Sequence, residues 1–384
     1  MTFQLASNLL QSVSIVDTNN NLSIYHYNQC DINSEDAIKR YRGIVMDKDG
    51  NVVCKSFDFT PELDENECDE EVEKFFSSSS QVTALKSYEA TLIRVYWNLT
   101  DDLVGGWYMS TCRKLDAFKS RWGGSKSFGE LFQECIGGGD FQEWCNEKLD
   151  KSKVYCYIIR TYDANRIVCK GFDKPQLYLV GTFTGEEFDI TSCEIECVSA
   201  SSLTEVKEEM TNIDHLKEQG LILINERGKC LKVLKHEYVE AFKLRGNQPN
   251  ILLRYVELQH EGDASRVEKF FNMYEEHKEL IINFTTVLED VCNFVFRKYR
   301  NRFIRKQVAI VPPELYHIIR DLHTEYLKNR ECIVTPERVN NYILSLEPMK
   351  LLNIYNNYTK RKEEFGNGNK LPREFMDKVK AMIV

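Results

Sequence analysis

The chain has 384 residues, of which 42% are hydrophobic and 28% charged, and its formal net charge at pH 7 is −9. This length exceeds one ordinary hydrophobic core and predicts two domains, while the apolar content excludes a largely disordered chain. Because the protein as a whole is acidic, contact with nucleic acid requires a local basic patch rather than a generally basic surface.

Residues 1–260 consist mainly of short runs rich in β-branched and aromatic residues, separated by turn signals. Three helical patterns, at residues 128–136, 140–149 and 203–219, interrupt these runs. The first domain is therefore expected to be α+β and built on antiparallel sheets. The expected strands lie in LSIYHYNQC (22–30), GIVMDKDGNVVCKSF (43–57), ATLIRVYWN (90–98), GGWYMSTC (105–112), VYCYIIRTY (154–162), QLYLVGTF (176–183), GLILINERGKCLKVLK (220–235) and ILLRYVEL (251–258).

An acidic segment separates two of these runs. Residues 61–81, PELDENECDEEVEKFFSSSSQ, are rich in carboxylates and end in four serines before the final glutamine. This composition predicts a solvated or mobile loop.

From about Ser265 the hydrophobic residues follow a helical period, recurring at steps of three and four as a buried helix stripe requires. Two further segments, 311–330 and 335–358, open with proline and an acidic residue, which is typical of helix starts. Residues 261–384 are thus expected to form an all-α domain. The stripe comprises Phe270, Phe271, Tyr274, Ile281, Phe284, Leu288, Val291, Phe294 and Val295.

The cysteines and histidines show no metal-binding pattern. The 13 cysteines lie singly, and the spacing of Cys193 and Cys197 fits neither a zinc site nor a redox motif, so we expect reduced thiols in a cytoplasmic protein. His317 and His323 are six residues apart and do not share one helix face. No segment reaches about 18 uninterrupted apolar residues, so no membrane span is expected.

The segment TALKSYEATLIRVYWN, residues 83–98, places a lysine at a strand end, followed by an acidic residue, a small residue and an apolar strand. Covalent nucleotidyltransferases use this arrangement: the amine attacks the α-phosphate of ATP, and the acidic residue holds the ribose. Taken alone, the motif at Lys86 is a weak signal, because most surface lysines do no chemistry.

The segments around Lys86 strengthen the signal by their order. RYRGIVMDKDGNVVCKSF precedes it, and WYMSTCRKLDAF, YCYIIRTYDANRIV, KEQGLILIN and KCLKVLKHEYVEAF follow. This succession, from Arg40 to Phe242, resembles the bacteriophage RNA ligase 1 family. The resemblance implies a ligase-type adenylyltransferase domain followed by an RNA-binding helical domain. It also implies three steps, in which ATP adenylates a lysine, AMP passes to an RNA 5′-phosphate, and a 3′-hydroxyl displaces AMP, with Mg²⁺ neutralising the phosphates.

The chain departs from the family's motifs at several charged positions. Anchoring the first motif on ATLI places Ser87 where the family has its nucleophilic lysine and Glu89 where it has an aspartate. The later motifs place Ile159 and Gln219 where the family has glutamates, and Leu234 where it has a second phosphate-facing lysine. A serine without a general base is a poor substitute for an amine, and leucine cannot replace a phosphate-binding charge. These losses predict a pseudo-ligase that binds RNA or nucleotide and needs no cofactor.

Two alternatives stay open. Lys86, Glu218 and Lys235 each lie one position from an expected catalytic site, and a β-bulge in each strand would turn them toward the nucleotide. The chain would then be an active ATP-dependent RNA ligase that forms a lysyl-AMP on Lys86, with ATP and Mg²⁺ as cofactors. Alternatively, it is a structural or assembly protein that keeps only the fold. YEATLIRVYW and RFIRKQVAIVPPE resemble members from large DNA viruses, and a viral protein would act in the cytoplasm of the infected cell.

The resemblance assigns nucleotide contacts to four charged residues. Arg42 and Lys55 lie in the hairpin where the family contacts phosphate, although KSFDFTPE departs from the family's pattern there. Glu89 and Lys232 belong to the first and fifth motifs. Apart from Mg²⁺ arriving with nucleotide, no metal site is expected.

Two basic stretches predict contact with RNA, because interleaved basic and aromatic residues meet phosphates and stacked bases together. The stronger is RKYRNRFIRK, residues 297–306, with six cations in ten residues. It fits equally the polar face of a helix whose Phe296, Tyr299, Phe303 and Ile304 point to the core. The expected RNA-binding residues are Arg113 and Lys114 in the first domain and Arg297, Lys298, Arg300, Arg302, Arg305 and Lys306 in the second.

Overall fold

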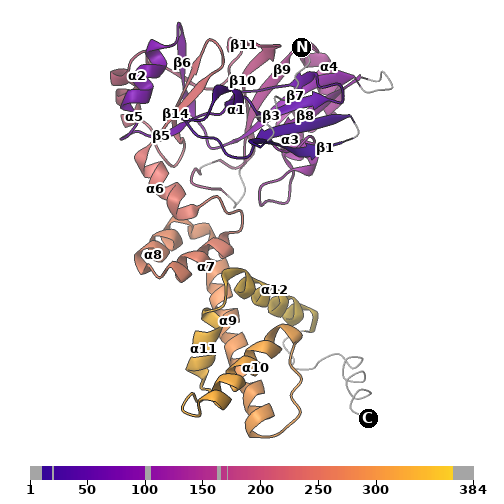
Figure 1. Ribbon diagram of the computed structural model, residues 1–384, viewed down its shortest axis with the longest axis vertical. Helices are drawn as coiled ribbons and strands as arrows, with labels where there is room; N and C mark the ends of the chain where they lie inside the picture. Colours follow the sequence, from indigo (N-terminus) through magenta and orange to yellow (C-terminus); the bar gives the residue numbers. More distant parts are fainter. Residues whose placement is uncertain (1–10, 20, 100–104, 162–165, 171, 366–384) are drawn as a thin grey trace. The chain divides into compact units, whose positions relative to one another are not determined.

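The computed structural model describes residues 11–19, 21–99, 105–161, 166–170 and 172–365. The chain forms two compact units, residues 1–249 and 250–384 (Figure 1). The first unit is mixed α and β and the second is helical, which confirms the expected α+β class followed by an all-α region. The boundary between the two units in the chain falls between Pro249 and Asn250, and the boundary expected from the sequence falls after residue 260.

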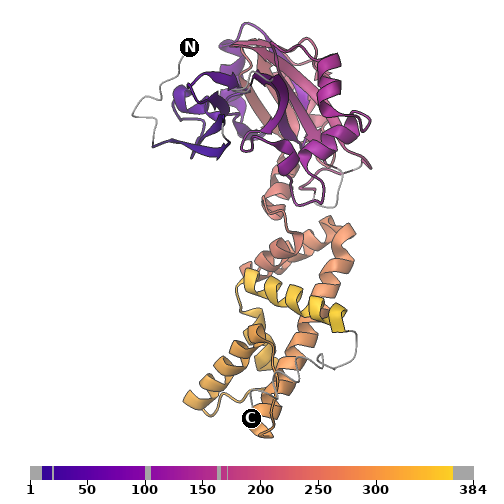
Figure 2. The ribbon, with the colours of Figure 1, turned by 90° about the vertical axis from the view of Figure 1, so that its right-hand side faces the viewer.

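The first unit contains three β-sheets, shown from the side in Figure 2. Every strand pair is antiparallel except β14 with β5. The first sheet has the order β1 (Val13–Thr18), β2 (Leu22–Tyr27), β3 (Arg42–Asp47), β4 (Val52–Cys54). The second has the order β11 (Glu187–Asp189), β10 (Gln176–Thr184), β9 (Val154–Arg160), β7 (Thr91–Leu99), β8 (Gly105–Thr111). The third has the order β12 (Cys197–Val198), β6 (Val82–Ser87), β13 (Gly220–Asn225), β14 (Cys230–Leu234), β5 (Glu62–Asp64).

The second sheet is covered on one face by α3 (Phe128–Cys135) and α4 (Phe141–Lys148), where Phe132 packs against Tyr157. Its other face packs against the third sheet in a core that includes Leu85 and Cys156. The short helices α1 (Asp36–Lys39) and η1 (Ala117–Lys119) lie in the connections. The first sheet joins the second through a separate cluster that contains Val45 and Tyr96.

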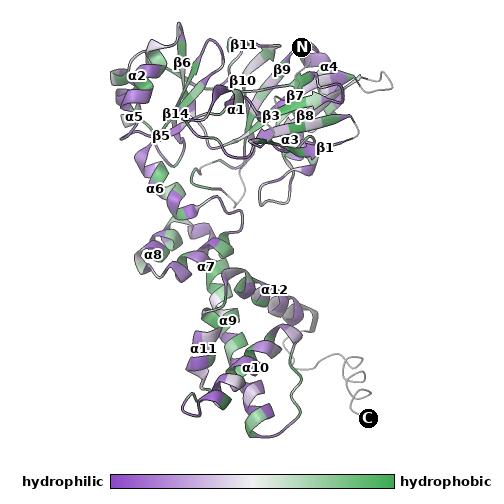
Figure 3. Ribbon diagram, in the orientation of Figure 1, coloured by the Kyte–Doolittle hydropathy of each residue, from purple (hydrophilic) through white to green (hydrophobic). Residues whose placement is uncertain are grey.

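The third sheet therefore has two different faces. Its inter-sheet face carries Leu85 and Ile222 against the second sheet. Its helix face carries Leu221 against α2 (Asp69–Ser77) and α5 (Leu203–Thr211). Because side chains alternate along a strand, neighbouring residues of β6 or β14 belong to opposite faces. Figure 3 shows hydrophobic residues concentrated on the strands and polar residues on the outside of the covering helices.

The acidic segment 61–81 is not a loop, so that prediction is wrong. It contains β5 and α2, and Val72 is fully buried under the third sheet. The three acidic residues in the first turn of α2 are favourable there, because the helix dipole is positive at its N-terminus. Val72 and two half-buried phenylalanines, Phe75 and Phe76, pack the helix against the sheet. The sequence analysis missed this helix because charged residues outnumber these apolar ones in the segment.

The second unit is organised around α9 (Lys278–Tyr299), which contacts α7 (Ile251–Glu261), α10 (Pro313–Lys328), α11 (Pro336–Leu344) and α12 (Pro348–Phe365). The helical stripe predicted from Ser265 onward lies on α8 (Ala264–Met273) and α9, and most of it is buried. A 3₁₀ turn, η2 (Glu275–His277), precedes α9, and a π-helical turn, η3 (Arg300–Ile304), follows it.

The strand predicted at 251–258 is α7 instead. A short continuous apolar run does not distinguish a buried helix from a buried strand. Asn250 caps the helix by accepting the backbone N–H of Leu253, and Gly262 ends it in the left-handed conformation. The helical prediction at 203–219 is also too long, because α5 ends at Thr211.

Candidate functional site

The strands that carry the lysine motif pair without irregularity. Ser87 lies opposite Gly220 and Lys86 opposite Leu221, and the register stays constant along β6, β13 and β14. A bulge would appear as a shift in this register. These strands therefore contain no bulge that would turn Lys86 to the inter-sheet face.

Lys86 lies on the side of β6 opposite to Ser87. Its Nζ forms ion pairs with Glu196 at 2.9 Å and with Glu218 at 3.8 Å. The hydrogen bond that Lys86 donates to Glu196 raises the pKa of Lys86, with a smaller contribution from the charge of Glu218. The amine is thus held as an ammonium ion, which has no lone pair for attack. Lys235 does not join this pair, since its Nζ contacts Glu65 at 3.3 Å.

A chain of polar side chains extends from Ser87 along the inter-sheet face. Ser87 Oγ and Lys232 Nζ both donate to Gln219 Oε1, each at 3.2 Å. Gln219 Nε2 donates to the Tyr238 hydroxyl at 2.7 Å, and that hydroxyl donates to Glu89 Oε2 at 3.1 Å. Tyr238 belongs to α6 (His236–Arg245), and its burial strongly raises its pKa, so it remains a donor. The structure thus brings together residues from the first, fourth and fifth motifs.

The carboxylate of Glu89 is fully used in bonds within the protein. It accepts the backbone N–H groups of Ile167, Val168 and Cys169 at 2.9, 2.8 and 3.2 Å, besides the Tyr238 hydroxyl. These amides belong to the segment matched to the family's third motif, whose Asn165 lies outside the described residues. Glu89 therefore connects the loop after β6 to this segment, and binding a ribose would require it to release one of these partners.

Arg160 occupies the inter-sheet side at the end of β9, and the sequence analysis missed it. Ile159, which was matched to the family's glutamate, is fully buried in the core under α3 and α4. The guanidinium of Arg160 lies 4.6 Å from the ring centroid of Tyr88 and 4.5 Å from that of Phe172. Strand alternation over VYCYIIR indicates this position, because the helix-facing aromatic Tyr157 puts Arg160 on the opposite face.

Arg42 contributes to the same region, whereas Lys55 does not. Arg42 Nη1 donates to Thr60 Oγ1 at 2.8 Å, just before β5. Glu62 of β5 pairs with Lys232 at 2.8 Å, and the charges of Lys232 and, more weakly, Arg42 lower the pKa of Glu62. Lys55 pairs instead with Glu186 in the turn between β10 and β11.

Arg113 and Lys114, the basic residues after β8, make contacts within the protein that fix the local turn. Lys114 Nζ lies 3.8 Å from Asp17 of the first sheet. The backbone N–H groups of Arg113 and Lys114 donate to Thr111 Oγ1, which fixes the turn. Trp122, an aromatic residue of the same stretch, packs against the core under α3 and α4.

The basic stretch of the helical unit lies at the end of α9 and along η3. Five of its six cations are exposed, and Lys298 is half-buried. Among the described residues, none of the six pairs with a carboxylate. Arg302 lies over the Tyr316 ring at 5.3 Å, and Phe303 stacks on His323 with ring centroids 3.6 Å apart. Ile304 was expected in the core if this were an ordinary helix face, but 63% of it is exposed.

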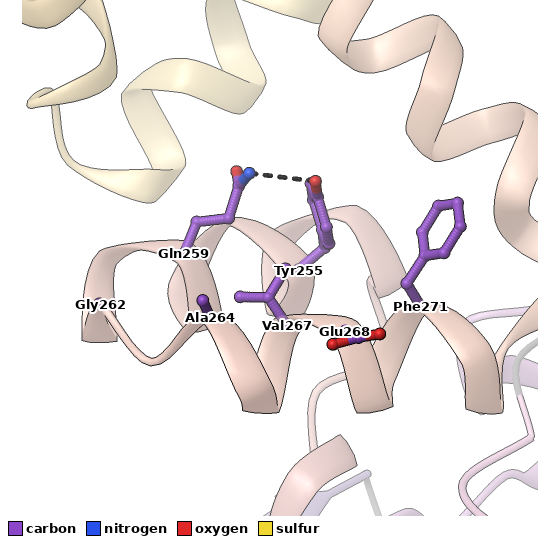
Figure 4. Close-up of a pocket in the computed structure, with 7 residues that line it drawn as sticks. All are labelled: Tyr255, Gln259, Gly262, Ala264, Val267, Glu268 and Phe271. Carbon is purple, nitrogen blue, oxygen red and sulfur yellow. Dashed lines mark hydrogen bonds between the residues drawn. The ribbon is translucent and has the colours of Figure 1, made fainter.

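A groove of about 450 Å³ lies between α7 and α8 (Figure 4). On its α7 wall, Gln259 donates to the Tyr255 hydroxyl at 3.0 Å. Within the described ranges there is no cluster of histidine, cysteine or carboxylate groups that could hold a metal, and no helix there is long and apolar enough to span a membrane. The groove is lined by Tyr255, Gln259, Gly262, Ala264, Val267, Glu268 and Phe271.

No protein family model matches the chain. The chain is 25% identical over 335 residues to an immediate-early protein ICP-46 homolog of Invertebrate iridescent virus 3, covering 83% of this chain and 73% of that protein. It is 25% identical over 327 residues to the homolog of Invertebrate iridescent virus 6, covering 77% and 69%. It is 28% identical over 204 residues to ICP-46 of Frog virus 3, covering 46% and 50%. The chain is thus similar in sequence to viral proteins, as the sequence analysis expects.

Solved structures similar to the chain include RNA ligases. An archaeal ATP-dependent RNA ligase aligns with 69% of this chain and 70% of its own, at 9% identity and a TM-score of 0.39. The Naegleria gruberi RNA ligase with pyrophosphate aligns with 45% and 56%, at 12% identity and a TM-score of 0.30.

Proposed function

We propose that this chain is an RNA ligase-like protein that binds RNA and no longer transfers adenylate. The observation that carries the proposal is the position of Ser87. It occupies the inter-sheet site, hydrogen-bonded to Gln219, whereas Lys86 lies on the other side of β6 as an ammonium ion. Among the described residues, the Ser87 hydroxyl makes its side-chain hydrogen bond to an amide, which cannot act as a base to activate it as a nucleophile.

The surrounding residues support the same conclusion. Phosphoryl transfer depends mainly on positioning and on cations that stabilise the developing charge. At the position of the family's second phosphate-facing lysine, Leu234 is buried and uncharged. Glu89 and Gln219 use their polar atoms on partners within the protein. Neither ATP nor Mg²⁺ is needed for the function that remains.

RNA binding is assigned to the basic surface, defined as Arg297, Lys298, Arg300, Arg302, Arg305 and Lys306. Cations without carboxylate partners are available to phosphates, and binding releases the counterions condensed on RNA. The exposed side chain of Ile304 and the ring of Tyr316, which is 39% exposed, add apolar surface for bases. An assembly protein that keeps only the fold has no need of such a surface.

The proposal is tested by incubating the purified chain with α-labelled ATP and Mg²⁺ and examining it on a denaturing gel, beside Lys86→Ala and Lys232→Ala. We expect no retained label in any of the three. Label on the wild type that Lys86→Ala abolishes would establish an active ligase instead. In parallel, a single-stranded RNA oligonucleotide is titrated with the chain, and absence of binding at low salt would favour the assembly protein.

A further inference from the structure

The inter-sheet site contains a carboxylate opposite Lys232 of β14. Glu62 and Lys232 are register partners in the parallel pairing of β5 with β14, and their charged groups are 2.8 Å apart. Lys232 is 19% exposed at its side chain, while Glu62 is 50% exposed. The cation therefore lies inside the site, and the anion reaches it from the solvent side.

The donors around Lys232 form a set suited to a larger anion. Lys232 Nζ shares Gln219 with the Ser87 hydroxyl, and the guanidinium of Arg42 is bound to Thr60, two residues before Glu62. Ammonium, guanidinium and hydroxyl groups that converge in this way bind phosphate groups well. In the structure, the only anion that Lys232 contacts among the described residues is Glu62.

The segment that carries Glu62 is held firmly against the site. Arg42 Nη1 donates to Thr60 Oγ1 at 2.8 Å and to the Asp58 carbonyl at 3.2 Å. The backbone N–H of Lys232 donates to the Pro61 carbonyl at 2.9 Å. These bonds fix the segment that leads into β5, so the backbone of Glu62 is held at the strand position opposite Lys232.

We propose that Glu62 is an intramolecular anion that competes with phosphate-bearing ligands for Lys232, and so lowers the affinity of the inter-sheet site for them. This proposal rests on the proposed function, because it treats the inter-sheet site as a former nucleotide site. Beyond that function, it assigns to Glu62 the role of setting how tightly the site binds phosphate groups. Because Glu62 is half exposed, its pairing with Lys232 is weak enough for an added anion to displace it. The ligand class is a small molecule with two or more adjacent phosphates.

The experiment measures binding of inorganic pyrophosphate by calorimetry, at constant ionic strength and without Mg²⁺, to the full chain and three variants. We expect Glu62→Gln to bind at least about threefold more tightly than the wild type, the range available from a half-exposed ion pair. The double variant Glu62→Gln, Lys232→Met should bind pyrophosphate no more tightly than the wild type. Asp69→Asn is the matched control, because Asp69 is 53% exposed and pairs with Lys207 at 2.6 Å on the helix face.

Equal affinity of Glu62→Gln and the wild type, or no binding to either, would overturn the inference. An equal gain in Asp69→Asn would also overturn it, since net charge rather than the site would then explain the effect. None of these results bears on adenylation, which the label experiment reports separately. If Glu62→Gln acquired label from α-labelled ATP, the competing-anion role would stand and the loss of adenylyl transfer would be refuted.

Discussion

Lys86 and Ser87 are consecutive residues of β6 that serve opposite faces of the third sheet. Ser87 Oγ donates to Gln219 at 3.2 Å on the inter-sheet face, whereas Lys86 Nζ pairs with Glu196 at 2.9 Å on the other side. A regular strand imposes this separation, because its side chains alternate. Lys86 therefore lies outside the hydrogen-bonded chain that links Ser87, Gln219 and Tyr238. We infer that its role is structural.

Lys86→Ala is therefore expected to lower stability without changing RNA affinity. It leaves Glu218, whose side chain is 14% exposed, close to Glu196 without the intervening cation. A partly buried pair broken on one side costs about 1 kcal/mol or somewhat more in the free energy of unfolding. Urea denaturation measures this loss. Lys74→Ala, which removes a lysine 70% exposed and paired with Glu71, should cost almost nothing, and equal losses would contradict the expectation.

Glu89→Ala should be among the most damaging polar substitutions in the first unit. It leaves three backbone N–H groups and the Tyr238 hydroxyl without their acceptor. Each of these four unpaired, partly buried donors costs about 1 kcal/mol, so we expect a loss of about 4 kcal/mol in urea denaturation. Tyr238→Phe removes one of these bonds and also the bond from Gln219 Nε2, so it should cost about 2 kcal/mol. A Glu89→Ala loss below that of Tyr238→Phe would show that the carboxylate is not the connection described here.

The antiparallel strands and the helical C-terminal unit follow from local patterns in the sequence. The Asp-Gly turn between β3 and β4 and the alternation along β9 are visible without a structure. The partners of charged residues are not visible, because they depend on register between distant segments. Glu62 and Lys232 are 170 residues apart and meet only through the parallel pairing of β5 with β14. Since 61–81 looked like a loop, the sequence offered no strand on which Glu62 could be placed.

His26 and His236 should titrate in opposite directions from the ordinary histidine value of about 6.5. Burial lowers the pKa of His26, and the charges of Arg113 and Arg42 add to the effect. The hydrogen bond that Asp64 accepts from the His236 ring, at 2.8 Å, raises the pKa of His236. The contribution of His236 to stability is thus present below about pH 6.5 and is lost as the pH rises through its folded pKa, whereas His26 disfavours folding as the pH falls below about 6.5.

An NMR titration of the histidine ring protons measures both values. Asp64→Asn should return the pKa of His236 toward about 6.5 and leave that of His26 unchanged. A His236 value at or below the ordinary one in the wild type would mean that the contact with Asp64 is not formed in solution.

The basic surface predicts a salt-dependent affinity for single-stranded RNA. Removing three of its exposed cations, Arg300, Arg302 and Arg305, by alanine substitution should weaken binding and reduce the slope of log affinity against log salt by about 2, since each phosphate contact contributes about 0.7. Filter binding at several salt concentrations measures the slope.

The matched control for the basic surface removes cations that already have partners in the same unit. Arg320, Arg338 and Lys350 pair with Asp321, Glu325 and Glu347, respectively. The triple alanine variant at these positions removes three positive charges, as the variant of the basic surface does. It should leave the slope of log affinity against log salt nearly unaltered. If both triple variants lost affinity equally, overall charge rather than the unpaired surface would account for RNA binding.

Gly43→Ala should destabilise the contact between the first and second sheets. Gly43 has φ +82°, and a Cβ there would lie 2.6 Å from the backbone oxygen of Cys112, which cannot move aside without shifting β8. The Gly43 carbonyl also accepts from Arg94, a fully buried guanidinium that further donates to Ser110 Oγ at 3.0 Å. Displacing the carbonyl removes an acceptor from a buried charge, so we expect a loss of about 3 kcal/mol in urea denaturation.

Gly138→Ala separates backbone strain from the contact with Cys112. Gly138 has φ +78°, close to that of Gly43, but a Cβ added to it meets no atom within 4 Å. This variant should cost only the strain of a left-handed alanine, about 1 kcal/mol. The difference in the free energy of unfolding between Gly43→Ala and Gly138→Ala then measures the combined contribution of the close approach of the two sheets and of the Arg94 hydrogen bond. Equal losses would show that Gly43 is required only for its backbone conformation, and that Arg94 finds another acceptor when the hairpin shifts.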